Sequence, residues 1–140
     1  MTVIVANLKA MAGDTRIVHD EVLVGSHRKV HVVRDMIVGY AGCMDSGILF
    51  LEWCQRGMGS RGKPSNLAEG FTGLVLNESG LYEYKFYLVP LKIEGGFWAI
   101  GSGAPAALGA MHMGAPPEEA VKVASGIDPS TGGPVVVETL

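Results

Sequence analysis

Apolar residues at the start of the chain form two short runs that predict a buried β-hairpin. Residues 1–8 read Met-Thr-Val-Ile-Val-Ala-Asn-Leu, a turn follows at Lys9, and residues 10–14 read Ala-Met-Ala-Gly-Asp. The first run is β-branched and apolar on both faces, which is typical of a strand covered on both sides. The hairpin brings the carboxylate of Asp14 back near the start of the chain. Residues 15–26 have mixed polarity and predict a loop with a short extended piece.

The next segments predict a second hairpin and then an apolar helix. Polar and apolar residues alternate over 27–33, and residues 36–41 form an apolar run after a short turn. Residues 47–56 predict a helix capped by Asp45 or Ser46. This helix is apolar on almost every face, so we expect it to be covered on more than one side.

Glycine-rich segments separate the remaining strands and helices. Residues 57–70 predict a flexible crossing. Three or four strands and two helices follow, and the second helix begins with Pro-Pro-Glu-Glu, whose acids complement the helix dipole. We expect strands at 71–75, 80–86, 87–93 and 96–100, helices at 104–113 and 116–126, and a last strand at 135–139. This order predicts an α+β fold, a single domain over 1–140 in which two antiparallel sheets pack face to face with helices outside.

Composition narrows the class of protein. The 140 residues are 48% hydrophobic and 18% charged, which suits a well-filled core and a sparingly polar surface of the kind found in oligomers. A formal net charge of −3 gives no basic surface for nucleic acid or anionic lipid, so neither a nucleic acid nor a membrane is an expected partner. No signal peptide or membrane span is visible, and Cys43 and Cys54 are expected to be reduced and buried, as in a cytoplasmic protein.

Two residues of the first half are candidates for chemistry. If Met1 is removed, the hydroxyl of Thr2 lies beside a free α-amine on the same residue, which is a nucleophile with its own base. Taken alone, a Met-Thr start more often carries no chemistry. Lys29 would ordinarily point to solvent from its strand. If it points inward beside Asp14 instead, the two form a buried ion pair that lowers the pKa of a nearby hydroxyl or amine.

Three glycine-containing loops have both a structural and a functional interpretation. Residues 39–42, Gly-Tyr-Ala-Gly, form either a tight turn or a backbone N–H donor for an oxyanion. Residues 101–106 also fit the dinucleotide pattern G-x-G-x-x-A, but the chain leaves no room for a parallel βαβ unit. In that loop, Ser102 either caps a helix or hydrogen-bonds the amine of the threonine. Residues 128–133 read as an Asx-type turn.

In this order, the motifs resemble the proteasome β-subunit family and its bacterial HslV-type relative, which are N-terminal nucleophile hydrolases. The resemblance covers nearly the whole chain. It rests on Thr2-x-x-Val5, Gly13-Asp14, His27-Arg28-Lys29-Val30, Gly39-Tyr40-Ala41-Gly42, Ala99-Ile100-Gly101-Ser102-Gly103 with Ala107-Leu108-Gly109-Ala110 behind it, and Ile127-Asp128-x-x-Thr131-Gly132-Gly133-Pro134. It implies a four-layer αββα sandwich, with a reduced helix layer because the crossing at 57–70 replaces the long second helix of the family.

The resemblance also implies a catalytic centre. Thr2 would be the nucleophile, with its α-amine as proton acceptor, since an α-amine has a pKa of about 7.7–8.0. Lys29, held by Asp14, would polarise the hydroxyl. The N–H of Gly42 would stabilise the oxyanion, a contribution of about 3 kcal/mol in comparable enzymes.

Two further residues would organise the amine of the nucleophile. Ser102 and Asp128 would tether the amine and orient the proton relay. No cofactor is required, although backbone carbonyls around Ser125, Asp128 and Thr131 could hold a monovalent or divalent cation, as in relatives.

The implied function is a threonine-type endopeptidase that cleaves polypeptide substrates inside a homo-oligomeric ring, with an AAA+ unfoldase as a further partner. The main alternative is a non-catalytic, ring-forming structural subunit of the same family. A third option, a small-molecule amide hydrolase, would be favoured by a monomer with an open cleft.

Overall fold

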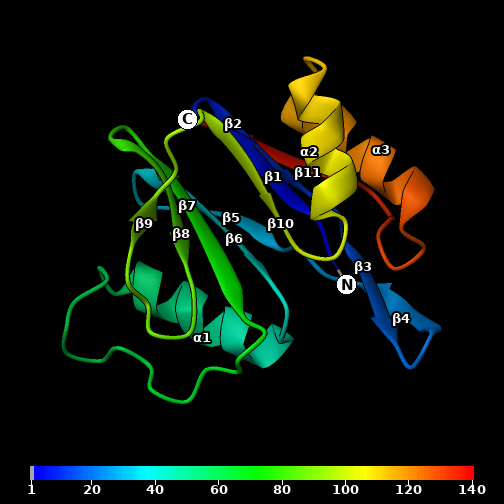
Figure 1. The fold of residues 1–140 in the computed structure, drawn as a ribbon. Helices are drawn as coiled ribbons and strands as arrows, with labels where there is room; N and C mark the ends of the chain where they lie inside the picture. The colour runs from blue at the N-terminus through cyan, green and yellow to red at the C-terminus, as the bar shows by residue number, and fades with distance from the viewer. Residues whose placement is uncertain (1) are drawn as a thin grey trace.

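In the computed structural model, which describes residues 2–140, the chain folds into four layers (Figure 1). Helices α2 (Ala104–His112) and α3 (Pro117–Ile127) cover a four-stranded sheet, and that sheet packs on a five-stranded sheet covered by α1 (Met44–Gln55). This is the predicted αββα sandwich, with one helix on the outer face of the second sheet.

The four-stranded sheet is antiparallel, in the order β10-β1-β2-β11. Its strands are β1 (Ile4–Asn7), β2 (Ala10–Gly13), β10 (Phe97–Ile100) and β11 (Val136–Thr139). Strand β1 is covered on both faces, as its sequence predicted: Ile4 belongs to the core between the sheets, whereas Val5 belongs to the core beneath α2 and α3. The sheet thus places the start of the chain in the middle of the molecule.

The five-stranded sheet is also antiparallel, in the order β5-β6-β7-β8-β9. Its strands are β5 (Val30–Val33), β6 (Met36–Ala41), β7 (Thr72–Asn77), β8 (Gly80–Tyr84) and β9 (Leu91–Lys92). Strand β9 is much shorter than the strand predicted over 87–93. Leu88 has a left-handed φ of 55° and its N–H donates to the carbonyl of Lys85, so the chain turns where the apolar pattern predicted extension.

Helix α1 packs on the sheet through one face, so the expectation that it is covered on more than one side is wrong. Phe50 and Trp53 are buried against the five-stranded sheet, whereas Ile48 is 40% exposed. The helix starts earlier than predicted, with Cys43 as its N-cap and no side-chain cap. Cys43 is exposed, contrary to the prediction, and Cys54 is buried as expected.

The crossing at 57–70 packs beside α1 and contributes a residue to the core beneath that helix. The hydroxyl of Ser46, predicted to be a helix cap, accepts the N–H of Ala68 at 2.8 Å, and Leu67 beside it is buried in the core beneath α1. Within residues 2–140, no helix is long and apolar enough to cross a membrane.

Residues 15–26, predicted to be a loop with a short extended piece, form a two-stranded hairpin that projects from the sandwich (Figure 1). Its strands β3 (Arg16–His19) and β4 (Val22–Ser26) make a separate two-stranded sheet. Asp20 and Glu21 connect them with φ of 49° and 65°, which suits a tight hairpin turn. The apolar run Val22–Val24 does not alternate with polar residues, and all five residues of β4 are exposed, so this strand differs from the half-buried strands that alternation predicts.

Candidate active site

Asp14 connects the first hairpin to the start of the chain. Its side chain is fully buried. The N–H of Val3 donates to Asp14 Oδ1 at 3.1 Å, and the N–H of Asp14 donates back to the Val3 carbonyl at 3.2 Å. This reciprocal pair fixes the residue next to Thr2 against the end of β2.

Lys29 points inward. The ordinary expectation that a strand lysine faces solvent is therefore wrong here, and the alternative, an inward orientation beside Asp14, is observed. Its side chain is 2% exposed, and Nζ donates to Asp14 Oδ1 at 3.0 Å and to the carbonyl of Arg16 at 2.7 Å. Burial lowers the pKa of Lys29, and the charge and hydrogen bond of Asp14 offset this only in part. The ammonium is therefore held in one position at the end of the sheet.

A cavity of about 250 Å³ brings together Thr2, Lys29 and Gly42, which lie far apart in the sequence. Its other lining residues are Arg16, Ile17, Val18, His19 and Met44. Within residues 2–140, the hydroxyl of Thr2 makes no hydrogen bond, although the residue as a whole is only 4% exposed. The hydroxyl is thus available to a molecule that enters this cavity.

Gly42 follows β6 and has a φ of 92°, a backbone conformation that favours glycine. A Cβ on this residue would lie 2.1 Å from the carbonyl oxygen of Gly70. The structure therefore requires glycine here for reasons of chain geometry, before any substrate is considered. The same geometry leaves the backbone of Gly42 exposed at the cavity that Thr2 lines.

A chain of hydrogen bonds holds the backbone nitrogen of Thr2. The Thr2 nitrogen donates to Ser102 Oγ at 3.2 Å, and Ser102 Oγ donates to Asp128 Oδ2 at 2.6 Å. The hydroxyl of Thr131 also donates to Asp128 Oδ2, and the N–H of Ser130 donates to Oδ1. Burial alone would raise the pKa of Asp128, but these hydrogen bonds outweigh it and the pKa is lowered, so the carboxylate stays ionised.

The glycines around Ser102 serve close packing on the start of the chain. Gly101 has a φ of 97°, and a Cβ there would lie 2.1 Å from the carbonyl oxygen of Thr2. The N–H of Gly103 donates to that same carbonyl at 3.1 Å. Ser102 is not the cap of α2, because Gly103 occupies the N-cap position. Of the two predicted roles of Ser102, contact with the threonine nitrogen is the one observed.

The three residues proposed as a carbonyl cation site lie close together at the end of α3. The carbonyl of Asp128 already accepts the N–H of Thr131 at 3.0 Å, and the hydroxyl of Ser125 donates to the carbonyl of Val121. Among the described residues, no group of three or more His, Cys, Asp or Glu side chains could hold a metal. A cation bound by these carbonyls therefore stays a prediction.

Two residues of the site were not predicted from the sequence. The main-chain carbonyl of Arg16 accepts a hydrogen bond from Lys29, and the guanidinium of Arg16 donates through Nη1 to the carbonyl of Pro129 at 3.0 Å. The N–H of Gly132 donates to Asp14 Oδ2 at 3.2 Å, and a Cβ on Gly132 would lie 2.5 Å from the guanidinium carbon of Arg16. The paired glycines at 132–133 were a usable signal of close packing, whereas a main-chain carbonyl ligand has no signature in sequence.

The fold has full-length counterparts among solved structures. BPH of Thiobacillus denitrificans aligns with a TM-score of 0.75 and 20% identity, over 99% of this chain and 96% of that one. Thiobacillus denitrificans BPH in complex with epoxomicin aligns with a TM-score of 0.76 and 19% identity, over 100% of this chain and 98% of that one. Eukaryotic HslV from Trypanosoma brucei aligns with a TM-score of 0.77 and 19% identity, over 99% of this chain and 98% of that one. No protein-family model matches the sequence, and the curated proteins give no match.

The chain therefore has the N-terminal nucleophile hydrolase fold that HslV represents, as the sequence motifs predicted. Its chemistry has to be argued from its own residues, because identities near 20% establish the fold alone.

Proposed function

We propose that this protein is a threonine-type endopeptidase with Thr2 as its nucleophile, working inside a self-compartmentalising ring. One arrangement carries the proposal. Thr2 lines a cavity together with Lys29 and Gly42, and its hydroxyl makes no hydrogen bond to the part of the chain that the structure describes, while its backbone nitrogen is held by Ser102 and, through it, by Asp128. A structural subunit has no need of this set.

The first step forms a tetrahedral adduct between the scissile carbonyl of the substrate and Oγ of Thr2. The α-amine accepts the hydroxyl proton while Oγ attacks the scissile carbonyl, and the ammonium of Lys29 favours the developing alkoxide. The negative charge moves to the carbonyl oxygen, which the N–H of Gly42 stabilises. Removal of Met1 is required, because only then does Thr2 carry the free amine. Met1 itself lies outside the described residues.

The second step releases the two products. The tetrahedral intermediate collapses, the C–N bond breaks, and the proton on the Thr2 ammonium passes to the leaving amine. The α-amine then takes a proton from water, whose oxygen attacks the ester, and Oγ leaves with that proton. Ser102 and Asp128 keep the amine in place through both steps, because Ser102 accepts a hydrogen bond from the Thr2 nitrogen and Asp128 holds the hydroxyl of Ser102.

Assembly into a homo-oligomeric ring is the second part of the proposal. Val22, Leu23 and Val24 are 63–64% exposed on the projecting hairpin, and consecutive exposed apolar residues of this kind favour burial against another subunit. A ring would confine cleavage to polypeptides delivered inside it, where an AAA+ unfoldase could supply them in the cytoplasm. Native mass spectrometry tests the assembly, and a monomer would favour the small-molecule amide hydrolase instead.

Intact mass spectrometry with a threonine-directed β-lactone tests the chemistry. We expect a chain that lacks Met1 and gains one adduct, which peptide mapping places on Thr2. The Thr2→Ala variant should gain none. A Thr2→Ser variant keeps a hydroxyl and should still react.

A second preparation separates processing from reactivity. Cleavage of an N-terminal ubiquitin fusion would expose Thr2 whether or not the host removes Met1. If that preparation forms no adduct and hydrolyses no peptide, the endopeptidase proposal is wrong and the non-catalytic ring subunit becomes the better interpretation. Epoxomicin serves as an additional probe, because a structure of BPH contains it.

A further inference from the structure

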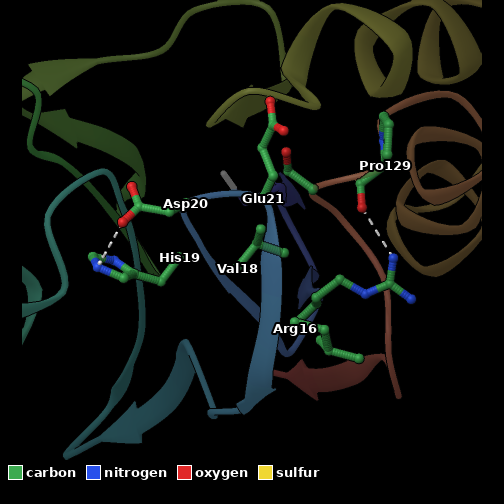
Figure 2. Close-up of a pocket in the computed structure, with 8 residues that line it drawn as sticks. Arg16, Val18, His19, Asp20, Glu21 and Pro129 are labelled. Atoms are coloured by element: carbon green, nitrogen blue, oxygen red, sulfur yellow. Dashed lines mark hydrogen bonds and ion pairs between the residues drawn. The ribbon is translucent and has the colours of Figure 1, made fainter.

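A larger cavity lies beside the one that Thr2 lines, along the same strand β3. Its volume is about 800 Å³, in the range typical of ligand sites. It lies between the projecting hairpin and the loop after α3 (Figure 2). The lining residues are Arg16, Val18, His19, Asp20, Glu21, Leu23, Pro129 and Ser130. Three of these, Arg16, Val18 and His19, also line the smaller cavity, so the two cavities adjoin along β3.

The proposed chemistry decides which half of a substrate would enter this cavity. The leaving amine must take its proton from the nitrogen of Thr2, so the leaving half must depart on the side of Thr2 where that nitrogen is held. Ser102 and Asp128 hold the nitrogen, and the next two residues, Pro129 and Ser130, form one wall of the larger cavity. The oxyanion site at Gly42 belongs to the smaller cavity.

Arg16 gives this cavity a chemical preference. Its guanidinium donates through Nη1 to the carbonyl of Pro129, and Figure 2 shows the side chain extended along the wall toward that carbonyl. The residue is half-buried, and within residues 2–140 it takes part in no ion pair. Since a guanidinium has five N–H donors, most remain available to a ligand.

The carboxylates near the cavity lie at its rim. Asp20 has a 91% exposed side chain, paired with His19 at 3.5 Å, and Glu21 is exposed at the hairpin turn. Charges at exposed positions are screened by water and salt, whereas a half-buried charge acts through a less polar medium. Among the charged residues that line the cavity, Arg16 is therefore the one whose charge acts most strongly on a ligand, whereas the ionised Asp128 before Pro129 is already hydrogen-bonded to Ser102, Ser130 and Thr131.

We propose that the larger cavity receives the leaving-group half of the substrate and that Arg16 selects a carboxylate there. This inference rests on the proposed peptidase activity and adds a substrate class to it. The carboxylate can belong to an acidic side chain after the scissile bond or to the C-terminus of a short peptide, because both present the same two oxygens to a guanidinium.

Internally quenched peptides that differ at one position test the proposal. Glu, Gln or Lys is placed directly after the scissile bond in C-terminally amidated peptides, and a fourth peptide has Gln there and a free C-terminal carboxylate two residues later. Mass spectrometry verifies the bond that is cleaved. We expect kcat/KM for Glu to exceed that for Gln by about tenfold, which corresponds to about 1.4 kcal/mol. A gain for the free acid over its amide would show that the terminus also serves.

Three variants identify the group responsible. Arg16→Gln removes the charge but keeps an N–H donor for the carbonyl of Pro129. This variant should cleave the Glu and Gln peptides with equal kcat/KM. Leu23→Asp adds a carboxylate to the cavity lining on the neighbouring strand β4 and should lower the Glu-to-Gln ratio of kcat/KM while Arg16 is kept, which keeps the test valid if Arg16→Gln unfolds. Because Leu23 also belongs to the proposed subunit contact, native mass spectrometry first verifies that this variant assembles as the wild type does. Glu21→Gln is the matched control at the rim of the cavity. It should cleave the Glu peptide in preference to the Gln peptide by at least the wild-type ratio of kcat/KM.

Three outcomes would overturn the proposal: equal kcat/KM for Glu and Gln, a wild-type preference for Lys over Glu, or a Glu preference that survives Arg16→Gln. Labelling by the β-lactone involves no peptide leaving group. Normal labelling without a Glu preference would therefore reject the role of the cavity alone, whereas absent labelling would reject the peptidase itself.

Discussion

Replacing Asp14 by Asn should destabilise the protein severely, although the two side chains have the same shape. Asp14 Oδ1 accepts the N–H of Val3 and the ammonium of Lys29, and Oδ2 accepts the N–H of Gly132. An Asn has a single oxygen, so its NH₂ group must face at least one of these donors.

The hydrogen bonds give the size of the effect. The less damaging amide orientation turns NH₂ toward Gly132 and leaves one buried donor without an acceptor, which costs about 1–3 kcal/mol. It also leaves the ammonium of Lys29 buried without its counter-ion, and removing one partner of a buried ion pair typically costs about 3–5 kcal/mol in total. The carboxylate in Lys29→Met still accepts two backbone N–H groups, from Val3 and Gly132. Lys29→Met should therefore cost less than Asp14→Asn.

Urea unfolding followed by tryptophan fluorescence measures both variants and their combination, since Trp53 is 4% exposed in the folded protein. The double variant should be less destabilised than the sum of the two single ones, by about 0.5–3 kcal/mol, because the pair is in direct contact. The reasoning is refuted if Asp14→Asn costs less than about 1 kcal/mol or if Lys29→Met costs more than Asp14→Asn.

Three further predictions concern stability. Gly42→Ala should cost more than the roughly 1–2 kcal/mol of a left-handed residue, because its Cβ would also meet the Gly70 carbonyl, whereas Gly25→Ala, with open space around it, should change the urea midpoint little. Phe50→Ala should cost about 3–5 kcal/mol by calorimetry, since Phe50 is fully buried. Burial lowers the pKa of Lys29 in the folded protein below its ordinary value of 10.5. Between the folded-state pKa and 10.5, the unfolded chain therefore binds more protons than the folded one, so the free energy of unfolding should rise with pH in that range, and Lys29→Met should lack the rise.

The sequence predicted the parts of the site that local patterns specify. The two-sided apolar run at β1 and the Gly-Asp at the end of β2 place Asp14 correctly, because the short loop between the two strands fixes the register of their hairpin. The inward orientation of Lys29 remained open, since a lysine in a strand usually points to water.

The remaining features depend on contacts that no local pattern encodes. The β3–β4 hairpin carries exposed Val22–Val24, so apolar alternation could not reveal it. Ser46 looked like a helix cap, but its hydroxyl holds a segment 22 residues away in the sequence. Arg16 acts on Lys29 through its main chain, and any residue type would offer that carbonyl.

The nitrogen of the second residue is held by residues 102 and 128, which enter the chain long after it. A ribosome-bound polypeptide that has only its first hundred residues therefore lacks the anchor for its own starting end. For the proposed peptidase, this order delays activity during synthesis: hydrolysis has to wait until residues 102 and 128 have been made and folded onto the first strand, so shorter nascent copies do not attack their neighbours.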